Sequence, residues 1–148
     1  MRVHRKAACL WLALLAAAPL CAELDQVKAE PNLEKRSRLA LEHAEKVLKE
    51  AREAYNKGET AEVEPLLTEM QNAVLLAESS LEATGKNPRR NPKYFKRAEI
   101  DTRNLLKRLD ALEQEMSVSD RSPVEKVKVK VQQVHDNLLS GIMEGRRK

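Results

Sequence analysis

Four stretches of the chain carry apolar residues at alternating intervals of three and four, and each stretch is bounded by a glycine or a proline. Such spacing places the apolar side chains on one face of an α-helix and is typical of helices that cross at about 20°. Helices are predicted at about 31–57, 62–84, 92–117 and 122–144. Short connections make consecutive helices antiparallel. The pattern therefore predicts an all-α, antiparallel up-down four-helix bundle over residues 31–145.

The apolar positions of these stretches are the predicted core. They are Leu41, Ala44, Leu48, Ala51 and Tyr55 in the first stretch; Val63, Leu67, Met70, Val74, Ala77 and Leu81 in the second; Phe95, Ala98, Thr102, Leu105, Leu109, Leu112 and Met116 in the third; and Val124, Val127, Val131, Val134 and Leu138 in the fourth.

Turn and capping residues mark the expected helix ends. Gly58 and Gly85 follow the first two stretches, where glycine takes a left-handed conformation at little cost. Pro65 favours a late start for the second helix, because proline is tolerated in the first helical turn. Ser122 and Glu125 form a capping box that predicts the start of the fourth helix.

Residues 126–131 alternate lysine and valine, which is the two-residue period of a β-strand. The capping box upstream and the continuing spacing of three and four downstream favour a helix here.

The first 22 residues have the organisation of a secretory signal peptide. Residues 1–6 contain three basic side chains, residues 7–20 are almost wholly apolar, and the small residue Ala22 follows. The apolar run is too short to cross a bilayer of ~30 Å as a helix. We expect cleavage after Ala22, export to the bacterial periplasm or beyond it, and a short tether at 23–30 before the bundle.

Both cysteines of the chain, Cys9 and Cys21, lie in this predicted signal peptide. The mature chain would then have no disulfide, no thiolate metal site and no cysteine nucleophile. Lipid attachment at Cys21 is an alternative to simple cleavage, but Leu20 precedes this cysteine where lipoprotein signals have a small residue. The chain has no Asn-x-Ser/Thr sequence, which together with the Ala- and Leu-rich apolar run favours a bacterial envelope.

Charge and motifs argue against several functions. The formal net charge is +4, but three of the 27 basic residues lie in the predicted signal peptide, so the predicted mature chain is nearly neutral. This balance gives no argument for nucleic-acid binding. The chain has no glycine-rich phosphate loop, no Gly-x-Ser-x-Gly and no His-Glu-x-x-His. We expect a protein without enzymatic activity.

Two histidines lie in the predicted bundle. His43 falls beside an apolar face and is expected to face solvent, and His135 lies at the edge of the apolar face of the fourth helix. Neither has the glutamate three residues earlier that di-metal carboxylate bundles use. A haem would need axial ligands such as His135 with Met70 or Met116. We expect no cofactor and no metal, and a cofactor- or metal-carrying bundle near His135 is the alternative function.

The segment from Lys86 to Arg97 contains six basic residues, no acidic residue, and two of the four aromatic residues of the chain. The chain also ends in basic residues. The second and fourth helices are expected to end at the same pole of the bundle, so the two basic segments should meet there. We call this predicted surface the basic pole; it comprises Arg89, Arg90, Lys93, Tyr94, Lys96, Arg97, Arg146 and Arg147.

The basic pole is the candidate contact surface for an unknown protein or an anionic component of the envelope. A purely structural interpretation is a proline-stiffened loop whose Phe95 enters the core while the charges stay hydrated. Self-association is a further possibility, because the many alanines and valines of the apolar faces predict a thin core.

Overall fold

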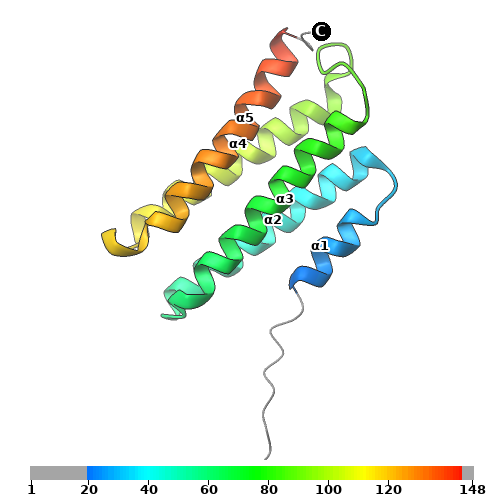
Figure 1. Ribbon diagram of the computed structural model, residues 1–148. Coiled ribbons are helices and arrows are strands. Elements are labelled where there is room, and N and C mark those ends of the chain that lie inside the picture. The colour runs from blue at the N-terminus through cyan, green and yellow to red at the C-terminus, as the bar shows by residue number, and fades with distance from the viewer. Residues whose placement is uncertain (1–19, 145–148) are drawn as a thin grey trace, which may run out of the picture.

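The structure, a computed structural model, describes residues 20–144 and is helical apart from short connections. The described helices are α1 (Leu20–Lys28), α2 (Leu33–Asn56), α3 (Thr60–Ala83), α4 (Pro92–Glu115) and α5 (Ser122–Glu144), with a single 3₁₀ turn at Val118–Asp120 (Figure 1). The all-α prediction is confirmed for this range, including the helix over residues 126–131. Most of the predicted signal peptide and the C-terminal basic residues lie outside the described residues. No helix in the described range combines the length and the apolar character needed to cross a membrane.

The four long helices form two antiparallel hairpins, α2 with α3 and α4 with α5. The hairpins pack so that α3 lies along α5 and α2 lies along α4, and each of these two pairs runs in one direction (Figure 1). By contrast, α3 and α4 are consecutive but make little contact. The expected antiparallel packing of neighbours therefore holds within the hairpins and not between them. The 84–91 connection permits this, because it is long enough to carry the chain diagonally across the bundle.

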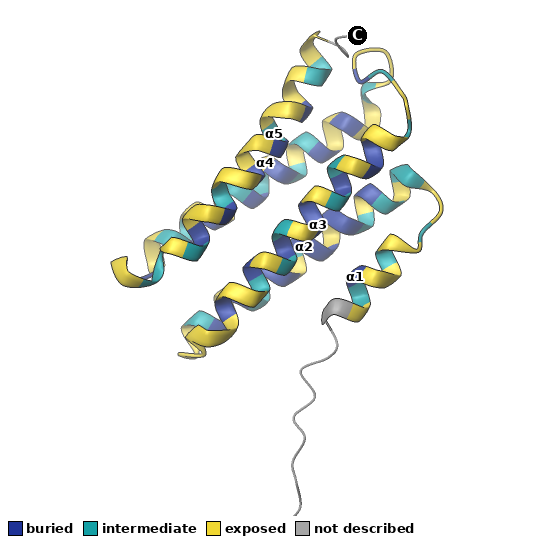
Figure 2. Ribbon diagram, viewed as in Figure 1, coloured by how far each residue is buried: buried dark blue, intermediate teal, exposed yellow. Residues whose placement is uncertain are grey.

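The core contains the residues that the apolar spacing predicts. Apart from Tyr55, every predicted core residue is buried, and the buried positions of the four long helices face one another (Figure 2). Tyr55 is half-buried because its hydroxyl reaches the α4–α5 connection, where it donates to Asp120 Oδ2 at 3.3 Å and accepts from the Ser117 N–H at 2.9 Å. Full burial of a large apolar side chain stabilises the fold by about 1.5–3 kcal/mol.

The start of α3 corrects the expectation drawn from Pro65. The helix begins at Thr60, so Pro65 lies within it rather than in its first turn. Proline there removes the N–H that would bond to the Ala61 carbonyl. Both residues are exposed, so water can satisfy that carbonyl. In return, the early start carries Val63 into the core.

Residues 23–30 are not a simple tether, because most of them belong to α1, which packs on α2 and α3. Leu24 is buried and Val27 packs against the same core. Lys46 Nζ donates to Glu23 Oε1 at 2.7 Å, and this bond lowers the pKa of the Glu23 carboxyl. All these contacts follow the predicted cleavage point, so they belong to the predicted mature chain.

One carboxyl group is poorly solvated in the contact between α3 and α5. Glu78 on α3 is partly buried, and its Oε1 accepts a hydrogen bond from Asn137 Nδ2 on α5 at 2.9 Å. Burial raises the pKa of Glu78, and the charge of Glu82 adds to the rise, although the bond from Asn137 opposes it.

We expect Glu78→Gln to stabilise the protein at neutral pH by under about 1 kcal/mol, because the amide avoids the cost of a buried charge and still accepts from Asn137. The pKa of Glu78 is higher in the folded state, so its contribution to stability falls as pH rises from the pKa of the unfolded state through that of the folded state. The gain over the parent should thus be absent at about pH 4 and present at about pH 7 in thermal melts.

Glu64→Gln, at an exposed position on the same helix, is the matched control for this prediction. A Glu78→Gln variant that melts below its parent at neutral pH would contradict it.

Candidate functional site

The connection between α3 and α4 is held against the end of α5. Gly85 ends the turn after α3 with a φ of +70°. Pro88 is buried, and a β-carbon added at Gly141 on α5 would lie 3.3 Å from Pro88 Cγ. The loop therefore packs on α5 at Gly141, which has no side chain, and Figure 1 shows the loop beside the C-terminal end of α5. The expected proximity of this loop to the end of the last helix is confirmed.

Local hydrogen bonds shape the tip of this loop. Asn87 Oδ1 accepts from the backbone N–H of Arg89 at 3.0 Å and of Arg90 at 3.3 Å. The Asn87 carbonyl accepts from the Asn91 N–H at 2.9 Å. Asparagine commonly organises turns in this way. Both arginine side chains are left exposed.

The other residues of the basic pole that the structure describes lie on the first turns of α4. Lys93, Tyr94, Lys96 and Arg97 are all exposed. The Lys93 ammonium lies 5.4 Å from the centroid of the Tyr94 ring, which is within the range of a cation–π contact. Arg146 and Arg147 lie outside the described residues. The neighbouring Phe95 is buried, as the structural interpretation of this segment expects.

The basic segment carries positive charge that other residues only partly balance. Lys86 pairs with Glu34, and Arg97 Nε lies 3.0 Å from Asp101 Oδ2. Within the described part of the chain, no ion pair involves the other four basic residues of the segment, which are Arg89, Arg90, Lys93 and Lys96.

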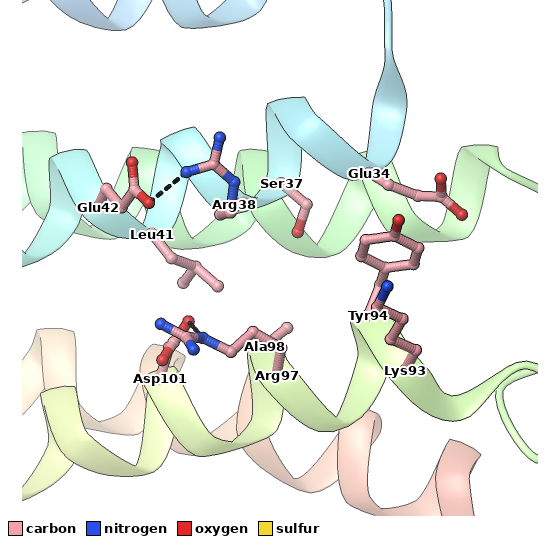
Figure 3. A pocket seen from close by; sticks show the side chains of 10 residues that line it. All are labelled: Glu34, Ser37, Arg38, Leu41, Glu42, Lys93, Tyr94, Arg97, Ala98 and Asp101. Atoms are coloured by element: carbon pink, nitrogen blue, oxygen red, sulfur yellow. Dashed lines mark hydrogen bonds and ion pairs between the residues drawn. The ribbon is translucent and has the colours of Figure 1, made fainter.

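A groove of about 530 Å³ opens beside this charged end, between the first halves of α2 and α4 (Figure 3). We call it the α2–α4 groove; it is lined by Glu34, Ser37, Arg38, Leu41, Glu42, Lys93, Tyr94, Arg97, Ala98 and Asp101. Its residues come from the two parallel neighbours, so it depends on the packing of the hairpins. Three of these residues, Lys93, Tyr94 and Arg97, also belong to the basic pole, and all three lie on α4.

The ion pairs of α2 and α4 explain why the groove is open. In the second half of the contact, Arg52 Nε donates to Glu115 Oε2 at 2.8 Å and joins the two helices. In the first half, Arg38 Nη1 lies 2.6 Å from Glu42 Oε1 on its own helix. Arg97 likewise pairs with Asp101 within α4. The charged side chains around the groove therefore do not bridge it.

Ser37 is the unusual residue of the groove. Its side chain is 2% exposed, and its hydroxyl is the one buried side-chain N or O atom in the described range without a hydrogen-bond partner. Ser80, which is also 2% exposed, instead donates to the Leu76 carbonyl at 2.6 Å. Figure 3 shows the Ser37 hydroxyl directed from α2 toward α4. A buried unpaired hydroxyl costs about 1–3 kcal/mol, which makes it a marker for a missing partner.

Ser37 was not among the predicted contact residues, although the sequence carries a signal for it. Ser37 lies one helical turn before Leu41 and continues the apolar line of the first stretch, so it is a polar residue at a core position.

His43 corrects another expectation, because it is buried rather than facing solvent, with an exposure of 6%. Its Nε2 lies 2.9 Å from Glu69 Oε1 on α3, and its Nδ1 lies 3.5 Å from Glu23 Oε2 on α1. The expectation was wrong because α1 covers this side of α2.

His135 is half-buried between α4 and α5. Its Nε2 lies 2.9 Å from Glu99 Oε1, and its Nδ1 lies 3.3 Å from Asp136 Oδ1. Binding of a metal or haem iron through this ring would require one of these contacts to break. Met70 and Met116 are buried in the core. Over residues 20–144, no group of three or more His, Cys, Asp or Glu side chains is placed to hold a metal ion.

We expect Gly141→Leu to release the 84–91 loop, because the new side chain would occupy the position of Pro88. Overpacking of this kind costs about 1–3 kcal/mol, so trypsin cleavage after Arg89 and Arg90 should accelerate by about tenfold or more. Limited proteolysis with mass spectrometry measures the rate.

Ser140→Leu adds the same side chain at the neighbouring exposed position and should leave cleavage unchanged. Equal cleavage of both variants would mean that the Pro88 contact does not hold the loop.

Comparisons of the chain with protein-family models, with curated proteins and with solved structures gave no match.

Proposed function

We propose that this chain is an exported, non-enzymatic four-helix-bundle protein of the bacterial envelope, and that the basic pole is its contact surface for an anionic partner. The observation that carries the proposal is the packing of Pro88 on Gly141, because it presents Arg89 and Arg90 from a fixed position. Export is supported by the signal-peptide pattern of the first 22 residues.

The positive charges of this surface that form no ion pair would attract an anionic partner. The four basic residues without ion pairs lie close together in sequence, on the loop and the first turns of α4. A basic side chain near an anionic membrane surface contributes about 1 kcal/mol. Salt screens this attraction within about 10 Å. A fixed loop also loses little conformational entropy on binding.

We expect the combined change Arg89→Glu, Arg90→Glu and Lys96→Glu to weaken association with the envelope fraction by about a hundredfold or more, because three attractions become repulsions. Co-sedimentation of the purified protein with isolated envelopes at low and high salt measures the association. The parent should bind at low salt and dissociate at high salt.

Three exposed lysines toward the opposite end of the bundle provide the matched control. The change Lys57→Glu, Lys126→Glu and Lys130→Glu alters net charge equally and should leave binding nearly intact. Equal loss in both triple variants, or no loss in the first, would contradict a localised contact surface. The intact mass of the recovered protein tests export, because cleavage after Ala22 predicts a chain that begins at Glu23.

The alternative function, a cofactor- or metal-carrying bundle near His135, stays a prediction. It requires that haem or a divalent ion raise the melting temperature of the parent and not of His135→Phe. If the carboxylate contacts of His135 persist, we expect no such rise. A rise in the parent that is lost in His135→Phe would favour this alternative.

A further inference from the structure

The α2–α4 groove has the size and shape of a site for an extended small molecule. Its volume of about 530 Å³ lies within the ~300–1,000 Å³ of typical ligand pockets. The lining residues span 34–42 on α2 and 93–101 on α4. This is about two helical turns, or roughly 12 Å, on each side. The two helices lie side by side, so the groove is elongated along both of them.

Apolar groups form the base of the groove. Leu41 and Ala98 are almost fully buried and the Tyr94 ring lies on the α4 side. Figure 3 shows Leu41 reaching from α2 toward α4, with Ala98 and the stem of Arg97 opposite it. Each methylene group of a ligand buried against such a surface raises affinity by about fourfold.

Polar groups of two kinds remain available in the groove. One is the Ser37 hydroxyl, which is buried and has no partner. The other is Lys93, the lining cation that forms no ion pair with any described residue. The other lining cations are Arg38 and Arg97, and each already has a carboxylate on its own helix.

These two groups match a carboxylate. One hydroxyl donor and one ammonium group satisfy the two oxygens and the single negative charge of that group. A phosphate monoester has three terminal oxygens and up to two charges, so it would leave acceptors unsatisfied. A cationic head group would face Lys93 without compensation.

We propose that the α2–α4 groove binds a single-chain amphiphilic carboxylate of the fatty-acid class. The carboxylate accepts hydrogen bonds from Ser37 and Lys93, and the alkyl chain lies along Leu41 and Ala98. The groove shares Lys93, Tyr94 and Arg97 with the basic pole, but Arg89 and Arg90 do not line it, so this binding does not depend on their contact with the envelope.

The direct test is calorimetric titration of the purified protein with decanoate below its micellar concentration. Decanol has the same chain without the charge, and decyltrimethylammonium has the opposite charge. We expect one decanoate per chain, bound at least about tenfold more tightly than either comparator. Equal affinity for all three amphiphiles would overturn the proposal.

Two variants test the head-group contacts. Ser37→Ala and Lys93→Met should each weaken decanoate binding by about tenfold, because each removes a hydrogen bond to a charged group. Ser37→Ala should also leave the melting temperature of the ligand-free protein equal or higher, because it removes an unpaired buried hydroxyl. Ser80→Ala, at a serine equally buried but already partnered, is the control and should not change affinity.

Ser37→Leu should abolish binding, because its side chain would fill the groove. Decanoate binding that survives both Ser37→Leu and Lys93→Met would overturn the assignment. Binding that appears only with dimer formation in sedimentation would overturn it too, and would indicate that a second copy of the chain covers the groove.

The result can be separated from the envelope proposal. The triple change Arg89→Glu, Arg90→Glu and Lys96→Glu should leave decanoate affinity within about threefold, because none of these residues lines the groove. Ser37→Ala should leave envelope association unchanged. Failure of one binding activity thus leaves the other proposal intact, and loss of both activities in either variant would contradict independent binding by the groove and by Arg89 and Arg90.

Discussion

Burial of the apolar faces of α2, α3, α4 and α5 in one common core is the interaction on which the other features depend. Each helix alone would expose its apolar stripe, and helices of this length owe most of their stability to packing. Once the two hairpins share a core, the remaining surfaces take defined positions. The 84–91 loop reaches α5 at Gly141, and α2 comes to lie along α4. Both candidate sites follow from this arrangement.

The distribution of ion pairs then decides which surfaces stay open. Arg52 and Glu115 join α2 to α4 in one half of their contact, whereas Arg38 and Arg97 pair within their own helices in the other half. Exposed pairs of this kind contribute little to stability, typically about 0–1 kcal/mol. Their importance here is geometric, because the within-helix pairs leave the groove open and leave the buried Ser37 hydroxyl without a hydrogen-bond partner. The 84–91 loop differs, since its arginines form no ion pair with any residue of the described range and are exposed.

Much of the fold could be predicted because its determinants are local. The spacing of three and four identified the core positions from Leu41 to Leu138, and the ends of the long helices were predicted within a few residues. Pro65 shows the limit of a local rule, since burial of Val63 outweighed the cost of a proline inside the helix. The short helix α1 escaped prediction because it has only nine residues, and Leu24 is the one buried residue among those of Ala22–Lys28. The prediction that His43 faces solvent was wrong because α1 was not predicted, and Glu23 on α1 lies beside this histidine.

Only one of the two candidate sites could be predicted from the sequence. The run of basic residues from Lys86 to Arg97 pointed to the loop, and alternating helix directions placed it near the end of α5. The groove could not be predicted, because Ser37 and Lys93 are far apart in the chain and line one groove only if α2 and α4 are neighbours. The sequence by itself determined the helices, their buried faces and the basic loop, because spacing, caps and charge runs act over a few residues. The tertiary structure decided which helices lie side by side, because a connection as long as 84–91 allows more than one packing of the same buried faces.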